Sequence, residues 1–596
     1  MPAITSRLAR SIYRALPRRA QIAARSALGG ALFARRSSGV AVPAWAPRTP
    51  VSIVIPSYND LPFLTKCLAS VELTCAGFEY EVIVVDDFCE PENRTRLRQV
   101  EGGRVRVIFR EHRGGFAKAV NTGIAEARWD VVLLNSDTVA QPGWLDALQR
   151  AAYTQPGVGL VSPMLVYPDG LIQYGGTYYA RRLAPQWYGH LYVGRTANDP
   201  LANQPWFIRS VSGACVYIRH EVLEAIGGLD EEFWLGFEDV DFGLRAWAAG
   251  FRSWYEPSAK LVHHESATRG YSQGKRELGS MRYFWRKWAP MVMERGLTSL
   301  PPVWFLSSAA STPLWREYVE QLSGEIAALG AQTQTHEVVG RIDEDFVARL
   351  EGLGAVVIAT DRATVETAWL ATQAGGIPVY LLPGIDADRP DLSDAARYAV
   401  SAAYRPEFDY IPPNRWSSDR LAAHSAWESR AIVPPVLRPP SPGKAATGVV
   451  TLGATSAERA VIDEVAGRLG AAVTHLAETD LSLQTLGEIA ALTPRVLVSF
   501  RSYEHSLEPF ALMAIGVAYM GVTNEKVRYE VLDGYNALLF DRSDSARLAQ
   551  SLEDALVDDT VHAELSANGH RSAALAYEAN APHIHRTLLD IASRAY

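Results

Sequence analysis

Between residues 51 and 300 the chain alternates short apolar, β-branched runs with stretches of helical spacing. The runs predict strands at Val51–Ile55, Glu81–Val85, Val105–Phe109 and Val131–Leu134. The first strand is expected to stop at the turn that begins with Pro56. Strands that alternate with helices form a mainly parallel sheet, and such sheets bind ligands where their strands end. Polar residues follow three of these strands, at Tyr58, at Asp86 and Asp87, and at Asn135–Asp137. We therefore expect them to meet in one crevice.

The alternation restarts after residue 300, and the 596 residues of the chain are too many for one ordinary core. Further strands are predicted at Val303–Leu306, Gly354–Ala359, Ile377–Leu382, Val449–Leu452, Ala472–His475 and Val496–Ser499. A Pro/Gly linker over Arg438–Gly443 divides them into two Rossmann-like halves. The predicted organisation is an N-terminal segment at 1–48, an α/β domain at 49–298, and the two halves at 299–437 and 445–596.

The N-terminal segment is strongly basic, with nine arginines and no lysine, aspartate or glutamate in residues 1–50. Apolar residues between the arginines fit a helix that lies on an anionic membrane surface, with residues 1–45 as the peripheral contact. A solvated tail and an organellar transit peptide are the alternatives, whereas Arg25 interrupts the apolar part too early for a secretory signal. The net charge of the whole chain is −8, so the residues after this basic segment are strongly acidic. An acidic body argues against nucleic acid as a partner.

Two further features bear on where the protein works. No run of roughly 18 or more apolar residues occurs, so no transmembrane helix is predicted. The four cysteines show no CxxC spacing, which in a chain of this size indicates a reducing compartment and no disulfide framework. We expect a cytoplasmic protein, with any membrane contact at the inner face of the cell membrane.

Three motifs carry residue types that suit one kind of chemistry. They are an Asn-Ser-Asp motif that ends at Asp137, a Glu-Asp-Val-Asp run that contains Asp239, and a His-His pair that begins at His263. Each alone has an ordinary explanation as a turn residue, a helix-dipole partner or a structural histidine. Together they predict a divalent cation, Mn²⁺ or Mg²⁺, on Asp137 and His263, and a carboxylate base at Asp239. Moving a sugar off a nucleoside diphosphate needs both, because the departing diphosphate gains charge and the incoming hydroxyl must lose a proton.

Several motifs, in the expected order over about residues 50–290, resemble family 2 glycosyltransferases, which have a GT-A fold. These motifs are Val51–Asn59, Val84–Asp87, His112–Asn121, Leu133–Thr138, Ser212–Arg219, Phe237–Arg245 and Val262–His264. An asparagine stands at position 135, where a strict Asp-x-Asp motif has an acid, and this variant is familiar in rhamnosyl- and galactofuranosyl-transferring members.

The resemblance implies an inverting, metal-dependent transfer of a sugar from a nucleoside-diphosphate sugar to a glycan or lipid-linked acceptor, in bacterial surface polysaccharide synthesis. It implies that Asp239 is the catalytic base and that Asp137 and His263 hold the metal. The donor-binding residues that it implies are Pro56, Tyr58, Asp86, Asp87, Asn135, Ser136 and Asp137. The acceptor-side residues are expected to be Glu238, Asp241, Arg245 and Trp234.

The C-terminal half resembles GT-B glycosyltransferases of the family 4 kind, at Ser499–Gly516 and Gly534–Phe540. That family presents two glutamates separated by seven residues, and Ala511 stands where the second is expected. Arg501 and Lys526 are candidate ligands for a diphosphate. This half is therefore expected to be either a second transferase or a degenerate acceptor-binding domain.

Two other classes remain open for the whole chain. One is a carbohydrate-binding or scaffolding protein with a non-catalytic domain, and the other is a sugar nucleotidyltransferase. A nucleotidyltransferase usually carries a Gly-rich loop with Arg or Lys after the first strand, and Pro56–Asn59 stands there instead.

Overall fold

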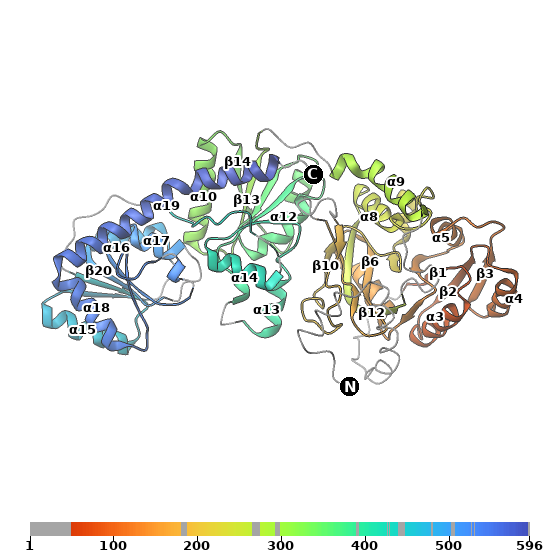
Figure 1. Cartoon of the computed structure of the whole chain (residues 1–596), viewed down its shortest axis with the longest axis horizontal. Helices are drawn as coiled ribbons and strands as arrows, with labels where there is room; N and C mark the ends of the chain where they lie inside the picture. The colour runs from red at the N-terminus through yellow and green to blue at the C-terminus, as the bar shows by residue number, and fades with distance from the viewer. Residues whose placement is uncertain are drawn as a thin grey trace. The chain divides into compact units, whose positions relative to one another are not determined.

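The computed structural model divides into two compact units, Met1–Glu294 and Arg295–Tyr596 (Figure 1). It describes residues 49–179, 188–264, 275–292, 299–388, 392–425, 427, 429–438, 448–477, 481–501, 507–525, 527–529 and 531–593. The predicted basic segment at 1–48 and Lys526 lie outside these residues. Among the described helices, none is both long and apolar enough to cross a membrane.

The first half of unit 1 is a parallel sheet in the order β4-β1-β2-β3. Its strands are β1 Val51–Ser57, β2 Tyr80–Asp86, β3 Val105–Phe109 and β4 Asp130–Leu134, and its helices are α3 Leu61–Thr74, α4 Pro91–Val100 and α5 Phe116–Ile124. β1 continues through Pro56, which pairs with Val85, because an extended strand accommodates the fixed φ of proline. The strand thus ends two residues later than the sequence predicted, just before the turn that carries Tyr58.

The second half of unit 1 extends this sheet with strands of both directions, to ten strands in all. The added strands are β5 Thr138–Ala140, β6 Val158–Val166, β7 Ile172–Tyr174, β10 Trp206–Ile208, β11 Cys215–Ile218 and β12 Arg252–His263. β8 Thr177–Tyr179 and β9 Tyr188–His190 form a separate two-stranded sheet. The helices here are α6 Trp144–Thr154, α7 His220–Ile226, α8 Glu238–Ala248 and α9 Lys275–Val292. β12 runs antiparallel to β5 and pairs His263 with Thr138, which brings two motifs that are distant in sequence side by side.

Unit 2 contains two five-stranded parallel sheets with the same strand order. The first consists of β13 Val303–Ser308, β14 Thr333–Val338, β15 Val356–Ala359, β16 Ile377–Leu381 and β17 Asp409–Ile411, with helices α10 Pro313–Ala328, α11 Glu344–Leu350, α12 Val365–Ala371, α13 Asp394–Ser401 and α14 Arg415–Ser425. The second consists of β18 Gly448–Leu452, β19 Val473–Leu476, β20 Pro494–Ser499, β21 Ala518–Val522 and β22 Leu538–Phe540, with helices α15 Ser456–Leu469, α16 Leu483–Ala491, α17 Leu507–Met513 and α18 Ser545–Val557. Together with unit 1, these sheets confirm the predicted α/β fold class.

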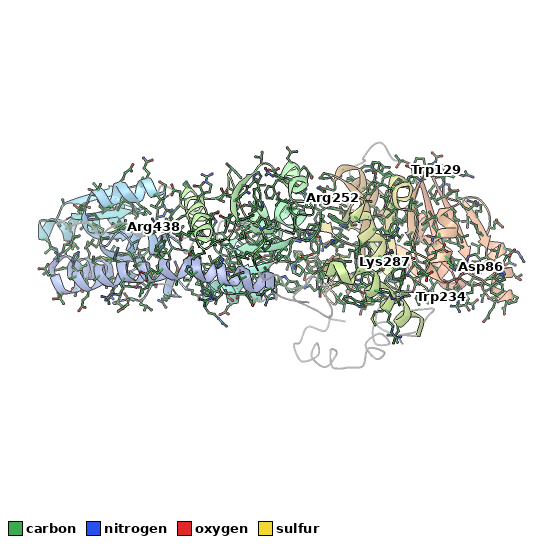
Figure 2. The ribbon with its side chains drawn as sticks, turned by 90° about the horizontal axis from the view of Figure 1, so that it is seen from above. Asp86, Trp129, Trp234, Arg252, Lys287 and Arg438 are labelled. Carbon is green, nitrogen blue, oxygen red and sulfur yellow. The ribbon has the colours of Figure 1, made fainter. Side chains whose placement is uncertain are left out.

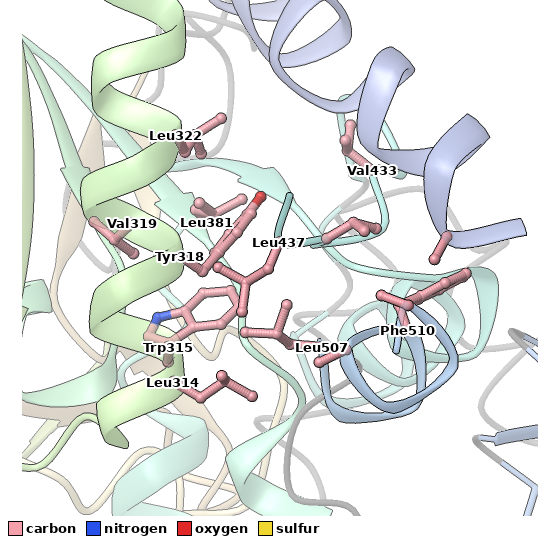
Figure 3. Packing of buried hydrophobic residues seen from close by; sticks show 14 of the residues in the cluster. Leu314, Trp315, Tyr318, Val319, Leu322, Leu381, Val433, Leu437, Leu507 and Phe510 are labelled. Carbon is pink, nitrogen blue, oxygen red and sulfur yellow. The ribbon is translucent and has the colours of Figure 1, made fainter. Parts of the chain in front are cut away.

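A long C-terminal helix, α19 (Asp559–Ser593), joins the two sheets of unit 2. It contacts both α17 and α10, and Tyr318 Oη of α10 donates a hydrogen bond to Asn580 Oδ1 over 3.1 Å. One apolar cluster includes Trp315 from the first half and Leu507 and Phe510 from the second (Figure 3). The halves therefore share a core, and burial of these large side chains holds them together.

Candidate active site

A cleft of about 680 Å³ lies in unit 1 where the strands of the parallel half end. Residues from both halves of the ten-stranded sheet line it. The predicted site residues that the structure brings together there are Pro56, Tyr58, Asp87, Asn135, Ser136, Asp137, Trp234, Glu238, Asp239 and His263. Asp86, Asp241 and Arg245 are not among the lining residues.

Asp137 and His263 form a close pair inside the cleft. His263 Nε2 lies 3.2 Å from Asp137 Oδ1, and its Nδ1 lies 2.7 Å from Gln173 Oε1. Because an amide oxygen only accepts hydrogen bonds, this partner assigns the proton to Nδ1 and directs Nε2 toward Asp137. Burial disfavours the charge of Asp137, but the neighbouring His263 outweighs it, and the pKa of this carboxyl lies below its usual value.

The pair has the donor chemistry of a divalent-cation site. Carboxylate oxygen and imidazole nitrogen suit Mn²⁺, and Gln173 holds the histidine as outer-shell partners of metal-bound histidines do. In the described parts of the chain, no group of three or more His, Cys, Asp or Glu side chains is placed to hold an ion. If an ion binds here, the described residues that could hold it are Asp137, through a carboxylate oxygen, and His263, through an imidazole nitrogen.

Asp60, which was not predicted from the sequence, is hydrogen-bonded to Ser136 of the Asn-Ser-Asp motif. Its side chain is 5% exposed and accepts hydrogen bonds from the hydroxyls of Ser57 and Ser136. Burial raises the pKa of Asp60, although both hydroxyls oppose the rise. These hydrogen bonds connect the turn after β1 to the turn after β4. Asp137 is the residue that follows Ser136 in the second turn. The only sequence signal for Asp60 is its position two residues after Tyr58.

Asp86 and Asp87 are adjacent but face different surroundings. Asp87 lines the cleft and accepts hydrogen bonds from the backbone amides of Gly114 and Gly115, each over 2.9 Å. Asp86 is fully buried behind the cleft wall, 2.9 Å from Arg94 Nε. In this conformation Asp86 stabilises the turn between β2 and α4, and its contact with a donor stays a prediction.

Gly115 must be glycine for two reasons, which predicts a large cost for Gly115→Ala. Its φ is +88°, and a Cβ would lie 2.6 Å from the backbone oxygen of Trp234. We expect Gly115→Ala to lower the free energy of unfolding by about 2–3 kcal/mol in urea titrations. Gly103→Ala is the matched control, because its φ is +60° but nothing lies within 4 Å, and it should cost about 1 kcal/mol. Equal costs for the two variants would mean that the contact with Trp234 is unimportant.

Asp239 lies in the first turn of α8, with its carboxylate at the cleft surface. Its Oδ2 accepts a hydrogen bond from Gly213 N over 2.7 Å, and its Oδ1 accepts one from Val240 N over 2.8 Å. These two donors fix the direction of a half-buried carboxylate that ligands can still reach. Phe237, just before the helix, has a φ of +71°, a conformation that a bulky residue holds only when its surroundings enforce it.

The other acidic residues of this run differ in position. Glu238 is buried and lines the cleft, whereas Asp241 is fully buried and is not among the lining residues. Arg245 Nε donates to Asp241 Oδ2 over 2.8 Å, and the same guanidinium donates to the carbonyls of Ile226 and Gly228. Asp241 and Arg245 thus connect α8 to the turn after α7, behind the acceptor side that the sequence assigned to them.

Arg113 is a second cleft residue that the sequence reading did not single out. Its guanidinium lies 3.7 Å from the centre of the Tyr58 ring, and it is the only Lys or Arg among the described residues that line the cleft. Five carboxylates line the same cleft, on Asp60, Asp87, Asp137, Glu238 and Asp239. Asp87 is ion-paired with Arg110, which lies outside the lining residues, and the other four carboxylates still outnumber Arg113.

Part of unit 1 is similar in sequence to known proteins. Residues 52–227 match the model of the Glycosyl transferase family 2. An uncharacterized protein, y4gI, of Sinorhizobium fredii is 33% identical over 257 residues, which is 40% of this chain and 27% of that protein. The O-antigen biosynthesis protein RfbC of Myxococcus xanthus is 33% identical over 226 residues, which is 37% of this chain and 18% of that protein.

An N-acetylglucosaminyl-diphospho-decaprenol L-rhamnosyltransferase of Mycobacterium tuberculosis is 27% identical over 241 residues, which is 37% of this chain and 77% of that protein. The matched part of the chain spans less than a third of the length of y4gI and of RfbC. The matched segment contains the turn after β1, the Asn-Ser-Asp motif and β11. Residues 52–227 therefore form a glycosyl transferase family 2 domain.

Proposed function

We propose that the cleft of unit 1 transfers a sugar, with inversion, from a nucleoside-diphosphate sugar to a hydroxyl of a glycan or lipid-linked saccharide. The observation that carries the proposal is the presence of the Asp137–His263 pair and the Asp239 carboxylate in one cleft. The names of the relatives in O-antigen biosynthesis and rhamnosyl transfer favour a role in making a bacterial surface polysaccharide.

The donor side of the proposal follows from charge. Asp87 is paired with Arg110, but a diphosphate that enters the cleft still meets repulsion from the other carboxylates, which Arg113 alone does not offset. Asp137 and His263 would hold Mn²⁺ or Mg²⁺, which when bound supplies a Lewis acid for the charge that grows on the departing diphosphate. Arg113 lies over one face of the Tyr58 ring, and the nucleotide base would stack on the other face.

The acceptor side follows from the orientation of Asp239. Its carboxylate takes the proton of the acceptor hydroxyl as that oxygen attacks the anomeric carbon, and the bond from this carbon to the diphosphate breaks. A single displacement of this kind inverts the anomeric configuration. Trp234, half-buried at the cleft, presents a ring on which an acceptor sugar can stack.

For unit 2 one observation favours an acceptor-binding domain, of GT-B-like kind, over a second transferase. Arg501, the predicted diphosphate ligand, is half-buried and pairs with the buried Glu508 through two contacts of 3.1 and 3.3 Å. A guanidinium whose charge is already matched by a buried carboxylate has little left to offer a diphosphate.

A donor screen on the full-length protein tests the proposal. We expect one nucleotide sugar to turn over with Mn²⁺ or Mg²⁺ present, and the same reaction to disappear in the full-length Asp239→Asn variant. Transfer that persists in this variant with another donor would assign a second activity to unit 2. Donor binding without any turnover would favour the carbohydrate-binding alternative, and formation of a nucleotide sugar from a sugar phosphate would favour a nucleotidyltransferase.

A further inference from the structure

Helix α9 places a lysine between two carboxylates behind the cleft. The side chain of Lys287 is labelled in Figure 2. Its Nζ lies 2.6 Å from Asp230 Oδ2 and 2.8 Å from Asp241 Oδ1. Trp288 Nε1 donates to Asp241 Oδ1 over 2.9 Å, and Tyr283 Oη donates to Asp230 Oδ2 over 3.0 Å. The ammonium of Lys287 therefore connects α9 to two other segments, the first turn of α8 and the turn that contains Asp230.

The first of these segments carries Asp239. Asp241 lies two residues further along α8, in the same first turn, and its side chain is 0% exposed. A buried carboxylate without partners is very costly, and Asp241 has three partners, Arg245 from its own helix and Lys287 and Trp288 from α9. The two contacts from α9 restrict where this turn can lie relative to α9. Burial disfavours the charge of Lys287, but the two carboxylates outweigh it and raise its pKa, so the lysine is charged at neutral pH.

The second segment is fixed to the donor half of the sheet. The turn that contains Asp230 is held by Asn121 of α5, whose side chain donates to Leu229 O and accepts from Leu229 N, each over 2.8 Å. α5 packs closely on β1, since a Cβ on its Gly123 would lie 2.4 Å from Val54. Lys287 thus connects the first turn of α8, which carries the proposed base Asp239, to the turn that contains Asp230. That second turn is held through α5 on β1, which precedes the donor-side residues.

Apolar contacts from α9 act on the same turn. Phe284 is fully buried in a cluster with Phe233, Val240 and Leu244. Its ring centre lies 5.1 Å from that of Phe237, the residue with positive φ just before α8. α9 therefore holds the strained start of α8 with an aromatic contact as well as with an ion pair.

We propose that Lys287, assisted by Trp288, is a positioning residue that sets the distance between the Asp239 carboxylate and the bound donor. The inference rests on the proposed transfer reaction. It assigns to α9 a role in the chemical step, although no α9 residue is among the described residues that line the cleft.

Lys287→Met tests this role in the full-length protein. A displacement of about 1 Å at a reacting group can cost about 10²-fold, so we expect kcat to fall by about 10–100-fold. Binding of the nucleoside diphosphate with Mn²⁺ should change by less than about twofold, because the donor residues lie on other elements. Lys287→Arg, which keeps the charge, should recover most of the lost kcat. Arg286→Met is the matched control, since Arg286 is the exposed neighbour on the same helix, and it should leave kcat unchanged.

A second, less disruptive variant tests the same role if Lys287→Met does not fold. Trp288→Phe keeps an aromatic side chain but removes the indole N–H that donates to Asp241, and it should lower kcat about 3–10-fold while the protein stays folded. Folded variants with unchanged kcat, or an equal loss in Arg286→Met, would overturn the positioning role while leaving the transfer reaction standing. Loss of diphosphate binding in parallel with kcat would also overturn it, because a structural defect acts on both. If the wild-type protein transfers no sugar from any donor, the proposed function itself fails.

Discussion

Asp239→Asn should lower the rate of sugar transfer by about 10²–10⁴-fold, the range that a positioned general base contributes. The amide keeps the size of the side chain and can still accept the hydrogen bond from Gly213 N, but it cannot take a proton. The nucleoside diphosphate should bind with Mn²⁺ as it does in the wild type, because Asp137 and His263 come from β-strand ends elsewhere in the cleft. Steady-state kinetics and calorimetric titration of the nucleotide separate these two effects.

The control for this variant is Glu72→Gln, which removes a negative charge from the exposed side of α3. It should leave turnover unchanged. A turnover within tenfold of the wild type in folded Asp239→Asn would mean that another group accepts the proton, and buried Glu238 in the same cleft would then be the first candidate.

Asp137→Ala should abolish the part of donor binding that depends on Mn²⁺ or Mg²⁺. Only His263 would then remain of the two proposed ligands, and the repulsion between the diphosphate and the other cleft carboxylates would be left without a cation to offset it. We expect donor affinity to fall by about 100-fold, which corresponds to about 2.8 kcal/mol. Isothermal titration with and without the metal, and with a chelator, measures both quantities.

Gln173→Leu provides a graded companion to Asp137→Ala. It removes the partner of His263 Nδ1 and should weaken metal affinity by about 10–100-fold without removing a ligand. If Asp137→Ala binds the donor equally well with and without Mn²⁺, and as tightly as the wild type does, the assignment of the metal to Asp137 is wrong.

Much of the fold was readable from local patterns. The four strands predicted between Val51 and Leu134 all occur, with ends that differ by a residue or two. Buried parallel strands are short and apolar throughout, so the pattern is strong in sequence. β12 was not predicted, because its twelve residues include Glu256, Pro257 and Lys260, which interrupt the apolar alternation typical of a strand. Such a strand forms because its neighbours β6 and β5 supply pairing partners, and these lie far away in sequence.

The motifs around Asp137, Asp239 and His263 were identifiable from the sequence alone, because their chemistry depends on residue type and on position after a strand or at a helix start. The same information could not separate Asp86 from Asp87, which differ in sequence by one position. Alternation along a strand end points one into the core, where it pairs with Arg94, and the other into the cleft.

The parallel strands, the strand ends that carry polar residues and the residue types of the site all follow from the sequence. Which of these residues share the cleft, and what holds them there, depends on tertiary packing. Asp60, Arg113 and Lys287 act across separations of tens of residues, through a hydroxyl, an aromatic ring and two carboxylates. No local pattern encodes such contacts, because they arise only when sheet register and helix packing bring distant segments within hydrogen-bonding distance.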